Sequence, residues 1–192
     1  MSEFSPSNYN ELMVNKTVIN GLFEINLVVN GDNRGWFKEN YQQAKLEALG
    51  LPHFESVQNN ISYNVEVGVT RGLHAEPWDK FISVANGDVF GAWVDLRLGP
   101  GFGQVFTARI DPGKAIYVPR GVANGFQTLD PNVVYTYLVN DHWSPNAKYS
   151  LVNLFDPELA IDWPYKQNEA IISEKDANHP TLSSLKASLL EK

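Results

Sequence analysis

Short β-rich segments separated by strong turn signals recur along most of the chain and restrict its fold more than any other feature. The segments combine aromatic and β-branched residues with partial period-two alternation: KFISVA (80–85), DVFGAWVDLRL (88–98), QVFTARI (104–110), AIYVP (115–119) and VVYTYLV (133–139). The turn signals are NGD (30–32 and 86–88), LGPGFG (98–103) and DPGK (111–114). This spacing predicts a mainly β protein, built as an antiparallel sandwich or barrel.

Helical patterns are confined to two stretches. These are YQQAKLEALG (41–50), closed by Gly50, and the C-terminal TLSSLKASLLEK (181–192). With 192 residues, 43% of them apolar and 19% charged, the chain suits a single domain spanning residues 1–192. We expect the core at about 21–164, flanked by peripheral N- and C-terminal arms. Such arms often reach a neighbouring subunit in jelly rolls, which favours a dimer.

Charge and cysteine content exclude several classes of function. The chain has 15 basic and 22 acidic side chains and a net charge of −7, so no basic field is available to hold a nucleic-acid polymer. It has no cysteine, which excludes thiol catalysis, disulfides and thiolate metal sites. The start lacks an apolar segment behind basic residues, and no later run approaches the roughly 18 apolar residues of a membrane span. We therefore expect a cytoplasmic protein that does not enter a membrane.

Familiar motifs for catalysis and nucleotide binding are missing. The histidines stand at 53, 74, 142 and 179, and no pair has the short spacing along one strand that a facial metal site needs. The sequence has no G-x-S-x-G elbow, no G-x-x-x-x-G-K-[ST] loop and no G-x-G-x-x-G before a helix. We therefore expect no metal, and any nucleotide site must use another architecture.

The densest group of polar residues is RGLHAEPWDK, which contains Arg71, His74 and Lys80. In a straight strand Arg71 and His74 would point to opposite faces, so the residues alone do not place them in one pocket. Taken singly, His74 is typical of a hydrogen-bonded structural histidine and Lys80 of a solvated edge lysine. Tyr137 would ordinarily pack, and Asp156, which precedes a proline, would ordinarily begin a turn or helix.

Longer segments, read in order, carry more information. They run from about Gly21 to Asp176: GDNRGWFKENY, VQNNIS, VTRGLH, DKFISVANGDVFGAWVDLRLGPGFG, IYVPRGVANGFQTL and FDPELAIDWP. Together they resemble the dTDP-4-dehydrorhamnose 3,5-epimerase family of dTDP-L-rhamnose synthesis. The resemblance implies a cupin-type antiparallel β jelly roll with short peripheral helices, usually homodimeric, without metal or organic cofactor. It implies a dTDP-4-keto-6-deoxy sugar as substrate, epimerised at C3 and C5.

The chemistry of that family explains the residue types. A proton next to a ketone is removed by a positioned base with a group that stabilises the enolate, and inversion then needs an acid on the opposite face. By resemblance, His74 is the base and Asp156 is the carboxylate that orients it. Lys80 stabilises the enolate, and Tyr137 is the acid.

The resemblance also implies a set of substrate-binding residues. They are Arg34, Phe37 and Glu39 at the nucleotide, Arg71 at the diphosphate, and Gln58 and Asn60 lining the same cleft. Asn124 stands where the family usually has a second histidine, Trp143 replaces a tyrosine, and the loop AEPWD is shorter than in many relatives. Because Asn124 cannot titrate, a C3-only epimerase or a 3,4-ketoisomerase remains an alternative. A non-catalytic sugar-nucleotide-binding jelly roll is another, and the presence of His74 and Tyr137 argues against it.

Overall fold

The computed structural model describes residues 4–191 and is dominated by strands. The strands are β1 (Met13–Lys16), β2 (Phe23–Asn26), β3 (Val29–Asp32), β4 (Gly35–Lys38), β5 (Gln58–Asn64), β6 (Val69–Ala75), β7 (Lys80–Asn86), β8 (Val89–Asp95), β9 (Val105–Ile110), β10 (Lys114–Val118), β11 (Val122–Thr128), β12 (Val133–Val139), β13 (Ser150–Leu151) and β14 (Ile171–Ile172). The α-helices are α1 (Gln43–Ala48), α2 (Glu174–Ala177) and α3 (Leu182–Leu190), and the 3₁₀ helices are η1 (Pro6–Asn8) and η2 (Pro157–Leu159).

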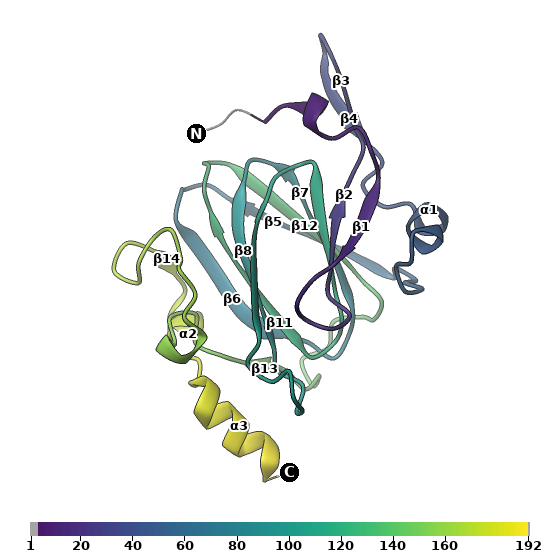
Figure 1. Ribbon diagram of the computed structural model, residues 1–192. Helices are drawn as coiled ribbons and strands as arrows, with labels where there is room; N and C mark the ends of the chain where they lie inside the picture. The colour runs from purple at the N-terminus through teal and green to yellow at the C-terminus, as the bar shows by residue number, and fades with distance from the viewer. Residues whose placement is uncertain (1–3, 192) are drawn as a thin grey trace.

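Two sheets make up the body of the protein (Figure 1). Within residues 4–191, one sheet has the strand order β1-β2-β10-β7-β12-β5 and the other β13-β6-β11-β8-β9, with antiparallel neighbours throughout. Strand β14 joins β6 in parallel, and β3 and β4 form a separate hairpin. The predicted mainly β antiparallel architecture is confirmed.

The core lies between the sheets and continues onto their outer faces. Strand β7 contributes to both regions. Ile82 and Val84 belong to the central cluster, whereas Phe81 packs on the opposite face of the sheet, against α1. Trp93, which is 1% exposed, anchors the centre. Burying a side chain of this kind contributes about 2–3 kcal/mol relative to leaving it in water. Leu185 of α3 helps to cover the outer face of the second sheet.

The C-terminal segment returns to β6. In β14, Ile171 pairs with Val69 and Ile172 with Thr70, and α2 follows directly and contacts the same strand (Figure 1). The sheets therefore extend beyond the expected core at 21–164, since β1 and β14 both take part. This return path brings the residues of α2 to the middle of β6.

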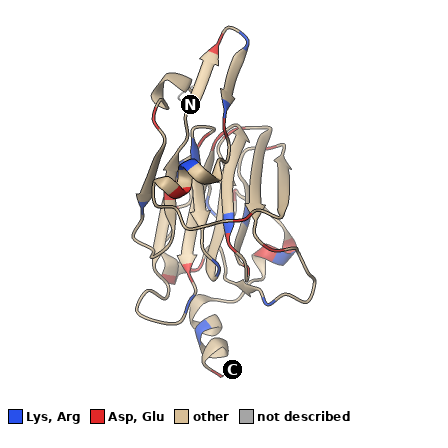
Figure 2. Cartoon of the chain, turned by 90° about the vertical axis from the view of Figure 1, so that its right-hand side faces the viewer, with Lys and Arg blue, Asp and Glu red and all other residues tan. Residues whose placement is uncertain are grey.

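The β3–β4 hairpin projects beyond the two sheets (Figure 1). At its tip, the Arg34 guanidinium pairs with the Asp32 carboxylate at 2.5 Å, and both side chains are largely exposed. Figure 2 shows acidic and basic positions interspersed over the face it presents, without a continuous basic band. No helix within residues 4–191 is both long enough and apolar enough to cross a membrane.

Candidate active site

A pocket of about 300 Å³ opens between the two sheets. Strands β5, β7 and β12 line it from one sheet, and β6 and β11 line it from the other, with residues around α2 closing one side. It brings together five of the residues predicted from sequence, namely Arg71, His74, Lys80, Asn124 and Tyr137. The pocket therefore gathers the proposed base, acid and enolate-stabilising lysine.

An irregularity in β6 allows Arg71 and His74 to line the same pocket. Arg71 pairs with Phe126 and His74 with Asn124, so three steps along β6 match two steps along β11. Such a bulge reverses the usual alternation of side chains. Gly72 has φ +123°, and a Cβ there would lie 2.6 Å from the Gly125 Cα, so glycine is required.

His74 is held by a carboxylate that the sequence did not predict. Its Nε2–H donates to Asp176 Oδ1 at 2.9 Å, and the Gly72 N–H donates to the other oxygen at 3.3 Å. Burial raises the pKa of Asp176, but the hydrogen bonds from His74 and Gly72 outweigh it, and the pKa lies below its usual range. The ionised carboxylate fixes the tautomer of His74, leaves Nδ1 for a ligand, and stabilises an imidazolium.

The prediction that Asp156 orients His74 is wrong. Asp156 is the N-cap of η2, where Oδ1 accepts from the Glu158 N–H at 3.0 Å and Oδ2 from the Leu182 N–H at 2.6 Å. Both carboxylate oxygens are thus used to join η2 to the start of α3. The cap that an Asp-Pro pair ordinarily forms is its observed role.

Lys80 lines the pocket with a buried side chain, and its ammonium has two polar partners. Its ammonium forms an ion pair with Glu76 and donates a hydrogen bond to Asn124 Oδ1. Burial lowers the pKa of Lys80, and the Glu76 charge opposes that shift. Glu76 was not predicted as a site residue, although it belongs to the same polar segment. Asn124 supplies a neutral acceptor for the lysine where the family usually has a histidine.

Tyr137 faces His74 from the opposite sheet. Burial raises its pKa, and the negative charge of Glu76 raises it further, so the phenol keeps its proton near neutral pH and can donate it. Tyr135, two residues earlier on the same face, is instead buried and stacks on Phe126, with ring centroids 4.1 Å apart. Both tyrosines line the pocket, and Tyr137 is the more accessible of the two.

The predicted polar residues of β5, Gln58 and Asn60, share a face of that strand with Ser62, which lines the pocket, but do not line the pocket themselves. Asn60 lies directly across from Tyr137 in the sheet, and Gln58 Nε2 donates to Asn60 Oδ1 at 2.8 Å. The backbone N–H of Trp143 donates to Gln58 Oε1 at 3.3 Å, and the indole of Trp143 is exposed. On the other side of the pocket, Arg71 Nε donates to the Asn64 side chain. These groups form a polar surface near the pocket that His74 and Tyr137 line.

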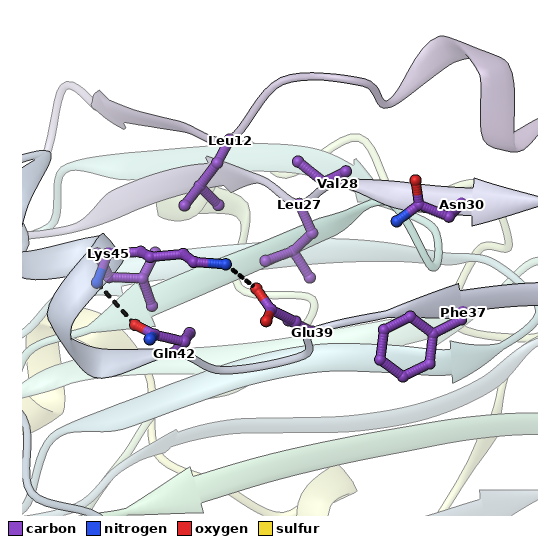
Figure 3. Close-up of a pocket in the computed structure, with 9 residues that line it drawn as sticks. Leu12, Leu27, Val28, Asn30, Phe37, Glu39, Gln42 and Lys45 are labelled. Atoms are coloured by element: carbon purple, nitrogen blue, oxygen red, sulfur yellow. Dashed lines mark hydrogen bonds and ion pairs between the residues drawn. The ribbon is translucent and has the colours of Figure 1, made fainter.

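The predicted nucleotide contacts of the hairpin lie farther from this pocket and do not line it. Arg34 lies at the hairpin tip, while Phe37 and Glu39 border a second pocket of about 320 Å³ at the foot of the hairpin (Figure 3). There Glu39 forms an ion pair with Lys45 of α1, and Leu27 provides part of the apolar wall. Within one protomer, the expectation of a common cleft is therefore wrong, because the hairpin carries these residues away from the sheets.

A further histidine approaches the His74–Asp176 pair. His179 Nε2 lies 3.6 Å from Asp176 Oδ1, and the three residues each offer a ligand-type atom, all within 4.8 Å of one another. Burial lowers the pKa of His179. Spacing along the sequence gave no sign of this group, because the fold alone brings His179 to His74. Among residues 4–191, these three side chains form the group that is arranged as metal ligands would be.

Comparison with known proteins supports the resemblance over most of the chain. Residues 16–184 match the model of the family described as dTDP-4-dehydrorhamnose 3,5-epimerase. A Streptococcus pyogenes serotype M6 protein named "Protein RmlC homolog" is 54% identical over 175 residues, which cover 88% of each chain. The dTDP-4-dehydrorhamnose 3,5-epimerase of Pseudomonas aeruginosa is 40% identical over 153 residues, which cover 76% of this chain and 82% of the relative.

A solved structure agrees with the fold. RmlC from Streptococcus suis, in complex with dTDP-D-xylose, matches with a TM-score of 0.87 and 50% identity. The match covers 91% of this chain and 93% of the S. suis chain. The expected cupin-type jelly roll is thereby confirmed.

Proposed function

Because the chain belongs to the dTDP-4-dehydrorhamnose 3,5-epimerase family, we propose that the pocket around His74 is its active site. The enzyme is an isomerase that inverts C3 and C5 of dTDP-4-dehydro-6-deoxy-D-glucose and so forms dTDP-4-dehydro-L-rhamnose for dTDP-L-rhamnose biosynthesis. One observation supports the proposed site above all. His74 belongs to one sheet and Tyr137 to the other, and both line the space between them.

The two-sided arrangement suits inversion at carbon. The Nδ1 atom of His74 takes the proton next to the C4 ketone, and Asp176 stabilises the resulting imidazolium through Nε2. Lys80 stabilises the negative charge that develops on the ketone oxygen. Tyr137 then returns a proton from the opposite side, because return from His74 would restore the original configuration. One proton leaves and one arrives at each centre, so the reaction balances without an oxidant or reductant.

The polar surface beside His74, Lys80 and Tyr137 recognises the nucleotide. Arg71 binds the diphosphate, for which a planar guanidinium offers paired donors. Gln58, Asn60 and Trp143 contact the parts of the substrate that extend past Tyr137. Asn124 acts through Lys80, because its Oδ1 accepts a hydrogen bond from the Lys80 ammonium.

We further propose that the enzyme is a homodimer in which the β3–β4 hairpin completes the partner's nucleotide site. Phe37 is 67% exposed on a hairpin that projects from the sheets, and Arg34 is exposed at its tip. An exposed aromatic on a projecting hairpin is best explained by a surface that covers it. Edge strand β5 adds a second apolar surface, because Ile61 and Tyr63 are exposed on its outer face.

Subunit mixing tests the dimer. An Arg34→Ala/Phe37→Ala variant and a His74→Ala variant should each be impaired, and mixing them under exchanging conditions should recover about a quarter of wild-type turnover. Half of the dimers are then mixed, and one of the two sites in each is intact. No recovery from exchanging dimers would show that the hairpin serves its own chain.

Heavy-water exchange tests the reaction itself. Incubation with dTDP-4-dehydro-6-deoxy-D-glucose should introduce deuterium at both C3 and C5, and His74→Ala should slow this by about 10²–10⁴-fold. Exchange at C3 alone would indicate a 3-epimerase, and the absence of exchange would indicate a binding protein. Either result would overturn the proposed reaction.

We also propose a cytoplasmic location. The chain lacks cysteine, which is compatible with a reducing compartment, and its substrate is a nucleotide sugar. Fractionation of cells that express the protein would test this, and recovery outside the cytoplasmic fraction would contradict it.

A further inference from the structure

His179 is a buried histidine that the epimerisation mechanism does not use. Its side chain is 3% exposed and lies shortly after α2, behind the wall of the active-site pocket. Among residues 4–191, the Val152 backbone is close enough to act on His179 as a hydrogen-bond partner, but neither ring nitrogen makes a hydrogen bond of ordinary geometry. Burying a polar group without a well-formed hydrogen bond is unfavourable, so such a histidine is available to bind a ligand.

The neighbours of His179 have the chemistry of a metal site. His74 and His179 offer imidazole nitrogens and Asp176 offers a carboxylate oxygen, a set that suits zinc, cobalt or nickel rather than magnesium. His74 comes from β6 and Asp176 from α2, while His179 belongs to the turn between α2 and α3. Residues far apart in the sequence therefore converge on one point.

The two separations that involve Asp176 are compatible with a tetrahedral ion, and the two histidine nitrogens lie within 4.8 Å of each other. Zinc–nitrogen and zinc–oxygen bonds of about 2.0–2.1 Å at the tetrahedral angle place neighbouring ligand atoms about 3.3–3.4 Å apart. The observed separations from Asp176 Oδ1 are 2.9 Å to His74 Nε2 and 3.6 Å to His179 Nε2, which bracket that value. His74 is one-third exposed, so its ring has room for the small adjustment. The pocket side, which His74 and Asp176 both line, would provide an open fourth position.

We propose that His74, Asp176 and His179 bind a divalent transition-metal ion of the zinc type, and that this ion inhibits the enzyme. Bound metal occupies His74 Nε2 and Asp176 Oδ1 together, so it replaces the hydrogen bond that sets the tautomer of the base. With the ion on Nε2, the proton of the neutral imidazole lies on Nδ1, so Nδ1 cannot accept the proton of the substrate. The metal is thus an inhibitor of an enzyme that is active without it, and removal of metal by a chelator should leave turnover unchanged or raise it.

Direct metal binding to the metal-free protein gives the first test, and it needs no substrate. Titration with Co²⁺ should produce the visible absorption of a tetrahedral ion at one equivalent per chain, and Zn²⁺ should displace it. In protein labelled with ¹⁵N-histidine, the ring nitrogens of His74 and His179 should shift together at one equivalent of Zn²⁺. Those of His53, which pairs with Glu47 of α1, should not shift at that ratio.

A matched pair of variants gives the second test. His179→Gln keeps a polar side chain but removes the imidazole, and it should raise the zinc concentration for half-inhibition by at least tenfold. Loss of even an outer-shell partner costs about 10–100-fold in metal affinity, and a direct ligand should cost no less. His53→Gln changes an exposed histidine and should leave the inhibition as in the wild type, with each variant compared with its own metal-free turnover.

Two results would overturn the proposal. One is unchanged zinc inhibition in folded His179→Gln, and the other is ring nitrogens of His179 in the wild-type protein that do not respond to one equivalent of Zn²⁺. The second measurement is independent of whether the variant folds. Because metal binding is observed without the sugar nucleotide, failure of the proposed epimerase reaction would leave these outcomes readable.

Discussion

Replacing Asp176 by asparagine should nearly abolish catalysis while preserving the fold. The Gly72 N–H donates to one oxygen of the carboxylate and His74 Nε2–H to the other. In Asp176→Asn, the amide oxygen is best placed facing the Gly72 N–H, so the NH₂ group faces His74. It then donates to Nε2 and keeps the imidazole proton on Nδ1, the atom that must accept the substrate proton.

The size of the loss follows from this tautomer reversal. The same exchange of a buried aspartate for asparagine beside the histidine of a serine-protease triad lowers turnover about 10⁴-fold. Four factors of ten correspond to about 5 kcal/mol of activation free energy. We therefore expect deuterium exchange at C3 and C5 to slow by about 10⁴-fold in Asp176→Asn, with a circular dichroism spectrum like that of the wild type.

Asp156→Asn is the matched control. Its amide can keep only one of the two hydrogen bonds that the carboxylate accepts from Glu158 and Leu182, which should cost about 1–2 kcal/mol of unfolding free energy. For a chain of this size that lowers the melting temperature by a few degrees, on the order of 2–8 °C. Turnover at 25 °C should stay within about twofold of the wild type. Exchange in Asp176→Asn within tenfold of the wild type, or a 10⁴-fold loss in folded Asp156→Asn, would refute the assignment.

Three further outcomes are expected. Arg71→Ala should weaken binding of dTDP in calorimetry, whereas Lys80→Ala should leave dTDP binding nearly intact and slow exchange at C3 and C5; the reverse pattern would contradict the division of roles. Because burial lowers the pKa of Lys80, its ammonium is lost below the pH of about 10.4 at which free lysine titrates. The pH profile of kcat/KM should accordingly decline on the alkaline side before that pH, and a profile flat to pH 10.5 would show that the charge is not needed. Gly72→Ala should cost at least about 2 kcal/mol in chemical denaturation, because its Cβ would lie 2.6 Å from Gly125 Cα, and a wild-type midpoint would argue against a required glycine.

Local pattern was sufficient for five strands, namely β7, β8, β9, β10 and β12, and for the longer helices, but not for β1 or β14. The segment VVYTYLV coincides with β12, from Val133 to Val139, and the stretch closed by Gly50 contains α1. In each case the information lies within a few residues, because alternation and turn chemistry act over that range. Helix α2 was missed since four residues are too few to show a period.

The carboxylate that pairs with His74 shows which contacts local pattern does not predict. Asp156 and Asp176 both stand at the beginning of short helices, where an aspartate is favoured for capping alone. Nothing near either residue distinguishes a cap from a partner of His74. The distinction arises because β14 pairs with β6 and delivers α2 to His74, a contact between segments about a hundred residues apart in sequence.

The sequence by itself therefore determined the mainly β architecture, the family, and the identities of His74, Lys80 and Tyr137 as candidates, since these depend on residue type and order. Tertiary structure decided which groups meet. The bulge at Gly72 turns Arg71 and His74 toward one pocket, because Gly125 on β11 lets the two backbones approach closely. The physical reason is that the chemistry of a side chain depends only on the residue itself. Whether two side chains meet depends on the pairing of strands far apart in the sequence, and no short stretch of sequence specifies that pairing.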